Sequence, residues 1–377
     1  MNEPEIRDVR SRSDRRAYLS LLRAPYADQR AWVHPDARTL KNLLRGKGWL
    51  ASRSEHRPLL ARVDGEPVAC LTAFLHQSFE EKLSRKIATL GFFEALPGQA
   101  DAVSQLFDEA ESWARERGAE RIWGPMNGHI MYGFGCLDNA YEKVPVIGTA
   151  YNRKEYPGYW WARQYKHAPS FYSYRIDLTR AETRDAIGVF AKNPRLDEEP
   201  RITIRRADLS QWRREVEIFI DLHNEAFRRN WGDTPLSHDE AWELMGLARY
   251  TTDPELFLIA EMGGKPVALV LCMADLNQVF HGVRREPSSL RAGLAYLTRR
   301  RSIRRGALHV IGVLEEARGR RLAETLAARA IQRFLDLGFT EMEYCLVLED
   351  NVPSQRIAKR FGGEHTKTYL MFEKVLR

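Results

Sequence analysis

The feature that most constrains the fold of this chain is an internal repeat. Residues 59–69 read LLARVDGEPVA, and residues 258–268, which begin 199 positions later, read LIAEMGGKPVA. Each stretch has two short apolar runs on either side of a glycine-containing turn, which is the pattern of a β-hairpin. A hairpin that recurs so far along the chain, with similar residues around its turn, indicates a duplicated structural unit.

The repeat continues beyond the hairpin, with an insertion in each copy. Two helical patterns further along end at Gly118 and Gly338, which lie 220 positions apart, and Asn152 and Asn351 again lie 199 positions apart. Each copy reads as a strand, helices, antiparallel strands, a strand that runs into a helix, another strand, and a last helix and strand. This order predicts an α/β fold with a mixed sheet in each of two tandem domains.

Length and composition agree with two domains. A chain of 377 residues with 44% hydrophobic residues can bury two cores. We predict an N-terminal domain at residues 1–180, a charged linker at residues 181–200 and a C-terminal domain at residues 201–377. The four cysteines form no Cys/His cluster, which argues against a structural metal site or a disulfide framework. The charged N-terminus and the lack of a long apolar run predict a cytoplasmic protein.

The stretch ARGRRLA, at residues 317–323, raises the main functional question. It follows an apolar run at residues 307–314, which predicts a buried strand, and it precedes a helix with an apolar stripe that ends at Gly338. Free backbone N–H groups at a helix start favour an anion. From the loop alone, a phosphate cradle and a basic turn without a ligand both stay open. The net charge of +7 allows an anionic partner but does not choose one.

The order of motifs around this loop resembles the coenzyme A site of the GNAT acyltransferase superfamily. The segments HVIGVLEEARGRRLAETL, EDN and QRIAKRFGGEHTKTYLMFEK carry the resemblance. It implies acyl-CoA as co-substrate without a metal ion, and it implies these cofactor-binding residues: Ile311, Gly312, Val313, Arg318, Gly319, Arg320, Arg321, Leu322, Ala323, Asn351 and Ser354. Two positions depart from the family pattern. Arg321 replaces a second glycine, and Ala358 stands where many members have a tyrosine that protonates the leaving thiolate.

Across nearly the whole chain, the sequence is similar to a tandem-GNAT family of bacterial proteins often called YghO-like. The stretches that carry this similarity are WVHPDARTLKNLL, GPMNGHIMYGFGCL, YNRKEYPGYW, HNEAFRRNWGDTPLS and DPELFLIAEMGGKPVALVLCMADLN. Some bacterial ceramide synthases look like members. The resemblance therefore implies transfer of a fatty acyl group from acyl-CoA to a primary amine, with a sphingoid-type lipid amine as the most specific expectation.

The first copy lacks the basic loop. Its counterpart of ARGRRLA reads LPGQADA, at residues 96–102, with no arginine. We therefore expect this half to shape the acceptor pocket or to pack against its twin. The candidate substrate-binding residues are Glu94, Asn127, His129, Tyr132, Tyr151 and Asn152.

The candidate catalytic residues lie mostly in the second copy. His309 has the most suitable unperturbed pKa for a general base, although its position in a strand slightly favours a structural histidine. Glu349, Tyr344 and Glu315 are further candidates, as are His129 and Glu94 of the first copy. A backbone N–H at residues 312–314 would serve as oxyanion donor.

The insertion at residues 290–306, LRAGLAYLTRRRSIRRG, predicts a helix with Leu290, Leu294 and Leu297 on one face and arginines after it. It is compatible with a solvated basic helix, an anionic membrane, the 3′-phosphate of the coenzyme or RNA. Three other functions also fit the sequence. They are a small-molecule N-acetyltransferase, a Fem-like aminoacyl-tRNA-dependent transferase, and a CoA-binding module without catalysis. The recognisable pyrophosphate loop argues against the tRNA-dependent transferase, so we do not expect nucleic acid as a partner.

Overall fold

The computed structural model describes residues 3–194, 196, 202–283 and 289–376, so residues 195 and 197–200 of the predicted linker lie outside the described residues. The chain forms two compact units. Unit 1 comprises residues 1–171, 280–288 and 368–377, and unit 2 comprises residues 172–279 and 289–367. The predicted boundaries at residues 180 and 200 stay a prediction.

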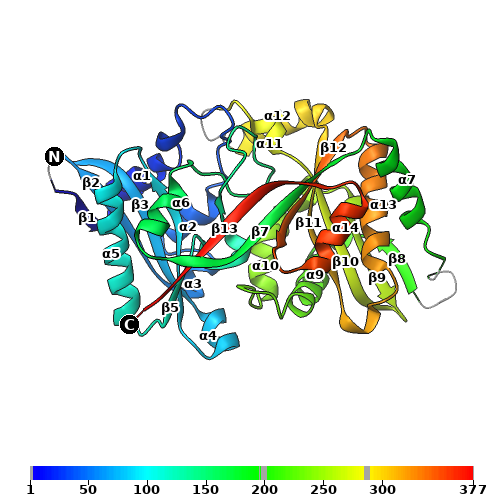
Figure 1. Ribbon diagram of the computed structural model, residues 1–377, viewed down its shortest axis with the longest axis horizontal. Coiled ribbons are helices and arrows are strands. Elements are labelled where there is room, and N and C mark those ends of the chain that lie inside the picture. Colours follow the sequence, from blue (N-terminus) through cyan, green and yellow to red (C-terminus); the bar gives the residue numbers. More distant parts are fainter. Residues whose placement is uncertain (1–2, 195, 197–201, 284–288, 377) are drawn as a thin grey trace. The chain divides into compact units, whose positions relative to one another are not determined.

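The elements up to the first copy's last strand follow the predicted order (Figure 1). They are β1 (Glu5–Asp8), α1 (Arg12–Leu21), η1 (Ala24–Tyr26), α2 (Arg38–Leu43), α3 (Trp49–Ser52), β2 (Ser54–Val63), β3 (Glu66–His76), α4 (Gln77–Leu83), β4 (Ile87–Ala95), α5 (Ala100–Glu116), β5 (Arg121–Gly124), η2 (Ile130–Tyr132), β6 (Cys136–Leu137), α6 (Tyr156–Ala162) and β7 (Lys166–Asp177).

The second copy repeats the plan with its own insertions. Its elements are α7 (Ala181–Ala191), β8 (Ile202–Arg206), η3 (Leu209–Gln211), α9 (Trp212–Ala226), α10 (His238–Met245), η4 (Gly246–Tyr250), η5 (Pro254–Leu256), β9 (Phe257–Met262), β10 (Lys265–Ala274), α11 (Asn277–Phe280), α12 (Ser289–Arg299), η6 (Arg300–Ser302), β11 (Arg305–Val313), η7 (Glu315–Ala317), α13 (Leu322–Asp336), β12 (Glu341–Leu348), α14 (Val352–Arg360) and β13 (Glu364–Val375).

The two units have the same sheet topology. In unit 1 the order is β1-β2-β3-β4-β5-β13, and in unit 2 it is β7-β12-β11-β10-β9-β8. The two hairpins predicted from the repeat are β2–β3 and β9–β10. In each sheet the strand after the hairpin runs antiparallel to it and then pairs in parallel with the next strand, as β4 with β5 and β11 with β12. The prediction of a mixed α/β sheet in each copy is confirmed.

The last strand of each copy is divided between the units. Residues 368–377, at the end of β13, belong to unit 1, while the segment of β7 from Tyr172 onward belongs to unit 2. Within unit 1, β13 runs antiparallel to β5, with Phe372 opposite Gly124. Phe372 is buried and stacks on Trp160 with ring centroids 5.4 Å apart. The end of the second copy therefore supplies part of the core of the unit that contains the first.

One long helix covers the antiparallel strands of each unit. In α5 the buried residues recur every three or four positions and pack on the sheet of unit 1, which is the helical spacing of an apolar face. In α13 the buried side chains include Leu322, Leu326 and Phe334. Leu337, which directly follows the helix, is 38% exposed. It is the C-cap residue, where the chain leaves the helical path.

Within the described residues, no helix is long and apolar enough to cross a membrane.

Candidate active site

The parallel strands β11 and β12 separate partway along their length. They pair only as far as Leu308 and Tyr344, although β11 continues to Val313. β11 keeps β10 as its neighbour over this second half. In the part of the chain that the structure describes, its other edge therefore has no strand partner from His309 onward, and His309 and Ile311 are only half-buried. Unpaired backbone groups at such an edge can bind an extended ligand.

His309 is the first residue of β11 beyond the paired stretch. Its Nε2 atom is buried and has no hydrogen-bond partner among the described residues. Burial lowers the pKa of His309 to about 4, because desolvation disfavours the charged imidazolium. The ring is therefore neutral at pH 7 and can accept a proton, although a base with so low a pKa is weak.

The loop after β11 has a backbone suited to an anion. Gly319 has φ of +82° and Arg321 has φ of +57°, so both lie in the left-handed region. Arg321 is also the N-cap residue of α13, which receives no side-chain capping hydrogen bond. The Arg321 side chain therefore does not cap the first N–H groups of this helix, and the positive end of the helix dipole faces the loop.

Neighbouring groups fix the carbonyls of this loop. Asn193 donates from Nδ2 to the carbonyl of Arg320 at 2.9 Å. The hydroxyl of Thr325 donates to the carbonyl of Arg321, also at 2.9 Å. Arg318 and Arg321 are exposed, and neither forms an ion pair with a carboxylate among the described residues. Two guanidinium groups beside a helix N-terminus make this loop a candidate phosphate site.

Three more predicted residues meet where β12 runs into α14. Asn351 caps α14 by accepting a hydrogen bond from the backbone N–H of Ser354. The Ser354 hydroxyl lies 2.9 Å from the hydroxyl of Tyr344, which is the last residue of β12 paired with β11. Burial raises the pKa of Tyr344 well above its usual value, so this phenol stays protonated, although an acid with so high a pKa is weak.

The tyrosine position of the family pattern holds no acid. Ala358 is completely buried in α14, and its carbonyl accepts a hydrogen bond from the N–H of Gly363. Tyr344 is a phenol that lies where β11 and β12 separate.

The two other predicted carboxylates of unit 2 are engaged. Glu349 accepts a hydrogen bond from the hydroxyl of Tyr172 at 3.4 Å. Glu315 lies on the surface, where it forms ion pairs with Arg228 at 3.6 Å and Arg229 at 3.7 Å. A catalytic role for Glu349 and for Glu315 stays a prediction.

His223 is a residue that sequence reasoning missed. It lies in the last turn of α9 and stacks on Phe227 with ring centroids 4.7 Å apart. The Phe227 ring would be 3.2 Å from a Cβ atom added at Gly312 of β11. Burial lowers the pKa of His223 to about 4, and the Asp233 carboxylate lies 3.8 Å from its Nε2 atom. The signal was present in HNEAFRRNWGDTPLS, but spacing alone does not show that this helix end reaches β11.

In unit 1 the corresponding position is filled by the chain itself. Strands β4 and β5 pair only as far as Thr89 and Trp123. Beyond them the N–H of Met126 donates to the carbonyl of Leu90. A Cβ atom at Gly91 would lie 2.3 Å from the Met126 carbonyl oxygen. Residues 125–135, which we call the filling segment, therefore pack directly against β4.

Asn127 and His129 are part of this filling segment. The Asn127 side chain accepts from the N–H of Phe92 at 2.7 Å and donates to the carbonyl of Tyr132 at 3.0 Å. His129 is buried, and its Nδ1 atom accepts from the N–H of Met131. Tyr132 is buried beside it, with ring centroids 6.5 Å apart. Internal bonds thus account for the polar groups of Asn127.

Glu94 lies at the end of β4, opposite Cys70 of β3. In unit 2 the equivalent residue of β11 is Gly312, opposite Leu269. One Glu94 oxygen accepts hydrogen bonds from the hydroxyls of Tyr26 at 2.7 Å and Tyr156 at 2.8 Å. Burial raises the pKa of Glu94 to about 8, so its carboxyl group is mainly protonated at neutral pH.

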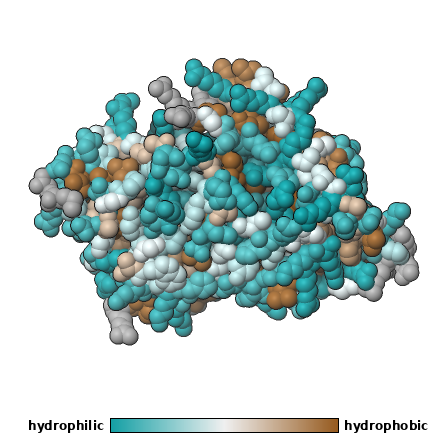
Figure 2. Space-filling model, turned by 45° about the horizontal axis from the view of Figure 1, so that its top comes forward, coloured by the Kyte–Doolittle hydropathy of each residue, from teal (hydrophilic) through white to brown (hydrophobic). Residues whose placement is uncertain are grey.

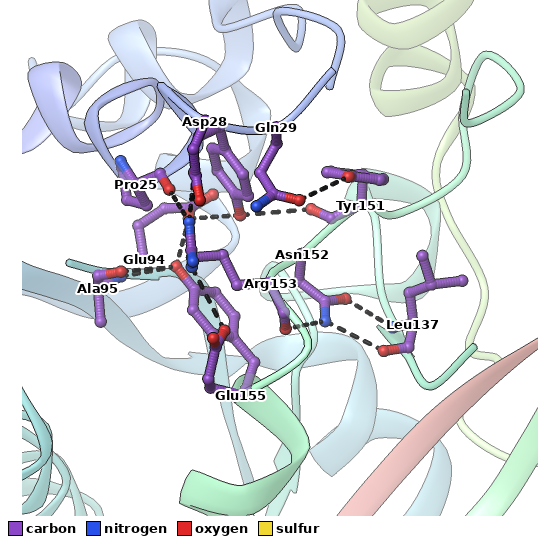
Figure 3. A network of polar contacts seen from close by, with 12 residues as sticks. Pro25, Asp28, Gln29, Glu94, Ala95, Leu137, Tyr151, Asn152, Arg153 and Glu155 are labelled. Atoms are coloured by element: carbon purple, nitrogen blue, oxygen red, sulfur yellow. Dashed lines mark hydrogen bonds and ion pairs between the residues drawn. The ribbon is translucent and has the colours of Figure 1, made fainter. Parts of the chain in front are cut away.

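Tyr151 and Asn152 belong to the same polar network of unit 1 (Figure 3). The Tyr151 hydroxyl donates to the carbonyl of Tyr141 at 2.8 Å and lies 3.4 Å from Gln29. The Asn152 side chain holds both backbone groups of Leu137. These two predicted substrate residues and Glu94 therefore form hydrogen bonds with other residues of unit 1. A role toward substrate stays a prediction for all six residues proposed in this half.

Among the described residues, no group of three or more His, Cys, Asp or Glu side chains is arranged to hold a metal ion.

Comparisons with known proteins agree with this geometry. Residues 216–362 match the sequence profile of the Acetyltransferase (GNAT) family. The bacterial ceramide synthase of Caulobacter vibrioides (strain NA1000 / CB15N) is 24% identical over 86% of this chain and 84% of its own length. Protein YghO of Escherichia coli (strain K12) is 21% identical over 98% of this chain and 95% of its own length.

A solved structure shows the same duplicated fold. It is a tandem GNAT protein from the clavulanic acid biosynthesis pathway, and it matches 100% of this chain and 99% of its own length. The TM-score is 0.59 at 13% sequence identity, so this match supports the fold alone. The profile match covers the strands and loop of unit 2 described above, while the full-length matches cover both copies. Residues 216–362 therefore match the GNAT acetyltransferase family, and over nearly its full length the chain is similar to protein YghO and to a bacterial ceramide synthase.

Proposed function

We propose that the chain is an acyl-CoA-dependent N-acyltransferase that binds the coenzyme at unit 2. The observation that carries this proposal is the loop at residues 317–323. It joins the separated strand β11 to the uncapped start of α13, with Gly319 and Arg321 in left-handed conformations. This backbone exposes N–H groups to a pyrophosphate, and Arg318 and Arg321 add positive charge. The acetyltransferase profile matches the same region.

The pantetheine arm of the coenzyme would lie along the open edge of β11. The N–H of Leu314 is not available there, because it donates to the carbonyl of Val267 at 2.8 Å. Hydrogen bonds alternate between the two edges of a strand. The N–H of Val313 therefore points to the edge that faces β12, and it is the donor that we assign to the thioester carbonyl and its oxyanion. The sequence predicted the oxyanion donor among residues 312–314, and we now assign it to Val313.

In the reaction, the amine nitrogen attacks the carbonyl carbon of the thioester and loses a proton, the carbon–sulfur bond breaks, and the thiolate takes up a proton. His309 is neutral and lies at the open edge of β11, so we assign it as proton acceptor. Tyr344 remains protonated and lies on the facing strand, so we assign it as proton donor to the thiolate. Positioning the two reactants supplies much of the rate enhancement.

The more specific proposal is transfer of a fatty acyl group to a sphingoid-type lipid amine. Its support is the similarity to the ceramide synthase of Caulobacter vibrioides over 86% of this chain. A small-molecule N-acetyltransferase uses the same fold and the same cofactor loop, so the acyl chain and the amine must be tested together.

The test measures thermal unfolding with free CoA, acetyl-CoA and palmitoyl-CoA. A ligand at 100 times its Kd stabilises the folded state by about 2.7 kcal/mol. We expect all three to stabilise the protein and palmitoyl-CoA to do so most. Arg318→Ala/Arg321→Ala should lose this response. The matched control is Arg329→Ala, which removes an exposed arginine further along α13 and should leave the response unchanged.

A turnover assay then follows release of the CoA thiol with a sphingoid base or a small polyamine as acceptor. Turnover with palmitoyl-CoA and the sphingoid base supports the lipid reaction, whereas turnover with acetyl-CoA and the polyamine supports the alternative. Binding of CoA without turnover for any pair would identify a binding module. Absence of stabilisation by all three ligands would contradict the CoA site.

A further inference from the structure

The helix α12 (Ser289–Arg299) is oriented with its large apolar side chains toward solvent. Leu290 is 85% exposed, Leu294 is 61% exposed and Leu297 is 63% exposed. Their spacings of four and three residues place them on one face of the helix. Ala295 and Tyr296, on other faces, are half-buried. The predicted shared face of the three leucines is confirmed, and this face is exposed to solvent.

A row of arginines adjoins this leucine face. Arg299, Arg300 and Arg301 are exposed, and so is Arg304. Arg299 donates to the carbonyl of Val279, and Arg304 donates to the carbonyl of Arg301. Within the described part of the chain, none of these four arginines forms an ion pair with a carboxylate. We call the leucine face and these four arginines together the α12 surface.

The α12 surface combines positive charge with apolar area, and this combination distinguishes three possible binding partners: RNA, a second copy of the chain and an anionic bilayer. RNA would use the arginines but leave three leucines in water. A second copy of the chain would cover the leucines but would bring two uncompensated arginine clusters together, which is unfavourable. An anionic bilayer satisfies both features, because its headgroups pair with arginine and its acyl chains accept leucine. Figure 2 shows hydrophobic atoms gathered at the upper edge of the molecule, where α12 lies in Figure 1.

We propose that the α12 surface binds an anionic lipid bilayer. The helix has 11 residues, and at about 1.5 Å per residue it is too short to cross the hydrocarbon core. It would lie in the plane of the interface, with its leucines inserted below the headgroups and its arginines at the level of the phosphates. This proposal does not depend on the proposed acyl transfer, because binding to lipid can be measured without CoA or an acceptor.

The experiment is co-sedimentation of the full chain with vesicles of phosphatidylcholine alone and of phosphatidylcholine mixed with phosphatidylglycerol. We expect binding to the mixed vesicles that weakens with added salt, and little binding to the neutral ones. Leu290→Ser/Leu294→Ser/Leu297→Ser should abolish binding. Arg300→Gln/Arg301→Gln should weaken it by roughly fivefold for each arginine removed.

Two control variants make the same kinds of substitution, leucine to serine and arginine to glutamine, at positions outside the α12 surface. Leu247→Ser removes a leucine of η4 that is 58% exposed, and Arg214→Gln/Arg329→Gln removes two exposed arginines of α9 and α13. Both should bind the mixed vesicles like the unmodified protein. Thermal unfolding checks that each variant is folded, and replacing exposed leucines should not lower its midpoint.

Three outcomes would overturn the proposal. The first is that the unmodified protein does not bind mixed vesicles. The second is binding that survives the triple leucine substitution. The third is a different occupant: either RNA binding that depends on the arginines but not on the leucines, or a dimer in sedimentation velocity that the leucine substitutions dissociate while vesicle binding is absent.

Discussion

At the scale of single residues, Arg321 takes a left-handed conformation at a position where the family pattern has glycine. Arg321→Gly relieves backbone strain but makes the unfolded chain more flexible, so its free energy of unfolding should stay within about 1 kcal/mol of the original. Arg321→Ala keeps the strain. If the guanidinium contacts phosphate, both variants should bind CoA roughly tenfold more weakly. Calorimetric titration measures this, and unchanged affinity in both would exclude Arg321 as a phosphate ligand.

Glu94 should make the stability of unit 1 depend on pH. Its pKa is raised to about 8 in the folded state from 4.5, so between these values the folded state binds more protons than the unfolded one. Stability therefore falls as pH rises through this range, with a contribution of at most about 1.4 kcal/mol per pH unit. In Glu94→Gln this slope should disappear.

Chemical unfolding at several pH values between 5 and 8 measures that slope. Tyr26→Phe is the matched control, because it removes one hydrogen bond to Glu94 but keeps the titrating carboxyl group, so a slope should remain. Equal slopes in the original protein and in Glu94→Gln would show that Glu94 does not cause the pH dependence.

At the scale of elements, the filling segment distinguishes the two copies. It packs against β4, where unit 2 has the open edge of β11, and Glu94 stands where unit 2 has Gly312. We therefore expect one CoA molecule per chain in calorimetric titration. A stoichiometry of two would contradict the assignment of the coenzyme to unit 2 alone. In Arg318→Ala/Arg321→Ala the single binding event should be lost.

The sequence predicted the helices and strands better than the tertiary contacts between them. The hairpins β2–β3 and β9–β10, the strand at residues 307–314 and the helix that ends before Gly338 follow from local periodicity and turn residues, and all are present. The contact of the Met126 carbonyl, in the filling segment, with Gly91 of β4 joins residues that are far apart in the sequence, so no periodic pattern predicts it. The proximity of the end of α9 to Gly312 also joins distant residues, and for this reason the sequence did not indicate His223 as a site residue.

The candidate CoA site could be predicted in part, because some of its residues are continuous in the sequence. A strand, a basic loop and a helix start are continuous in the sequence, so the position of residues 317–323 between β11 and α13 could be read directly. The left-handed φ of Arg321 could not, because arginine rarely adopts it and the hydrogen bonds to the loop carbonyls from Asn193 and Thr325 are not evident from the sequence.

At the scale of the whole molecule, the end of β13 stabilises unit 1 although it follows unit 2 in the sequence. Ending the chain after Lys367 removes the pairing with β5 and the buried Phe372. We expect unit 1 to lose most of its stability while β9 to β12 of unit 2 remain protected. Hydrogen exchange, read separately for β4–β5 and for β9–β12, measures this difference.

Phe372→Ala is the milder test of the same contact, since loss of a buried phenylalanine costs about 3 to 5 kcal/mol. Its effect should also be largest in β5. Equal loss of protection in both units would mean that they unfold as one cooperative body.

The placement of residues 368–377 has a consequence for biosynthesis. The ribosome makes residues 1–171 first, then all of unit 2, and only afterwards the strand that completes the sheet of unit 1. During translation, β5 therefore emerges without its neighbour β13 and presents an unpaired edge. A nascent chain stalled before residue 368 should be more susceptible to proteases and more dependent on chaperones in its first half than in its second.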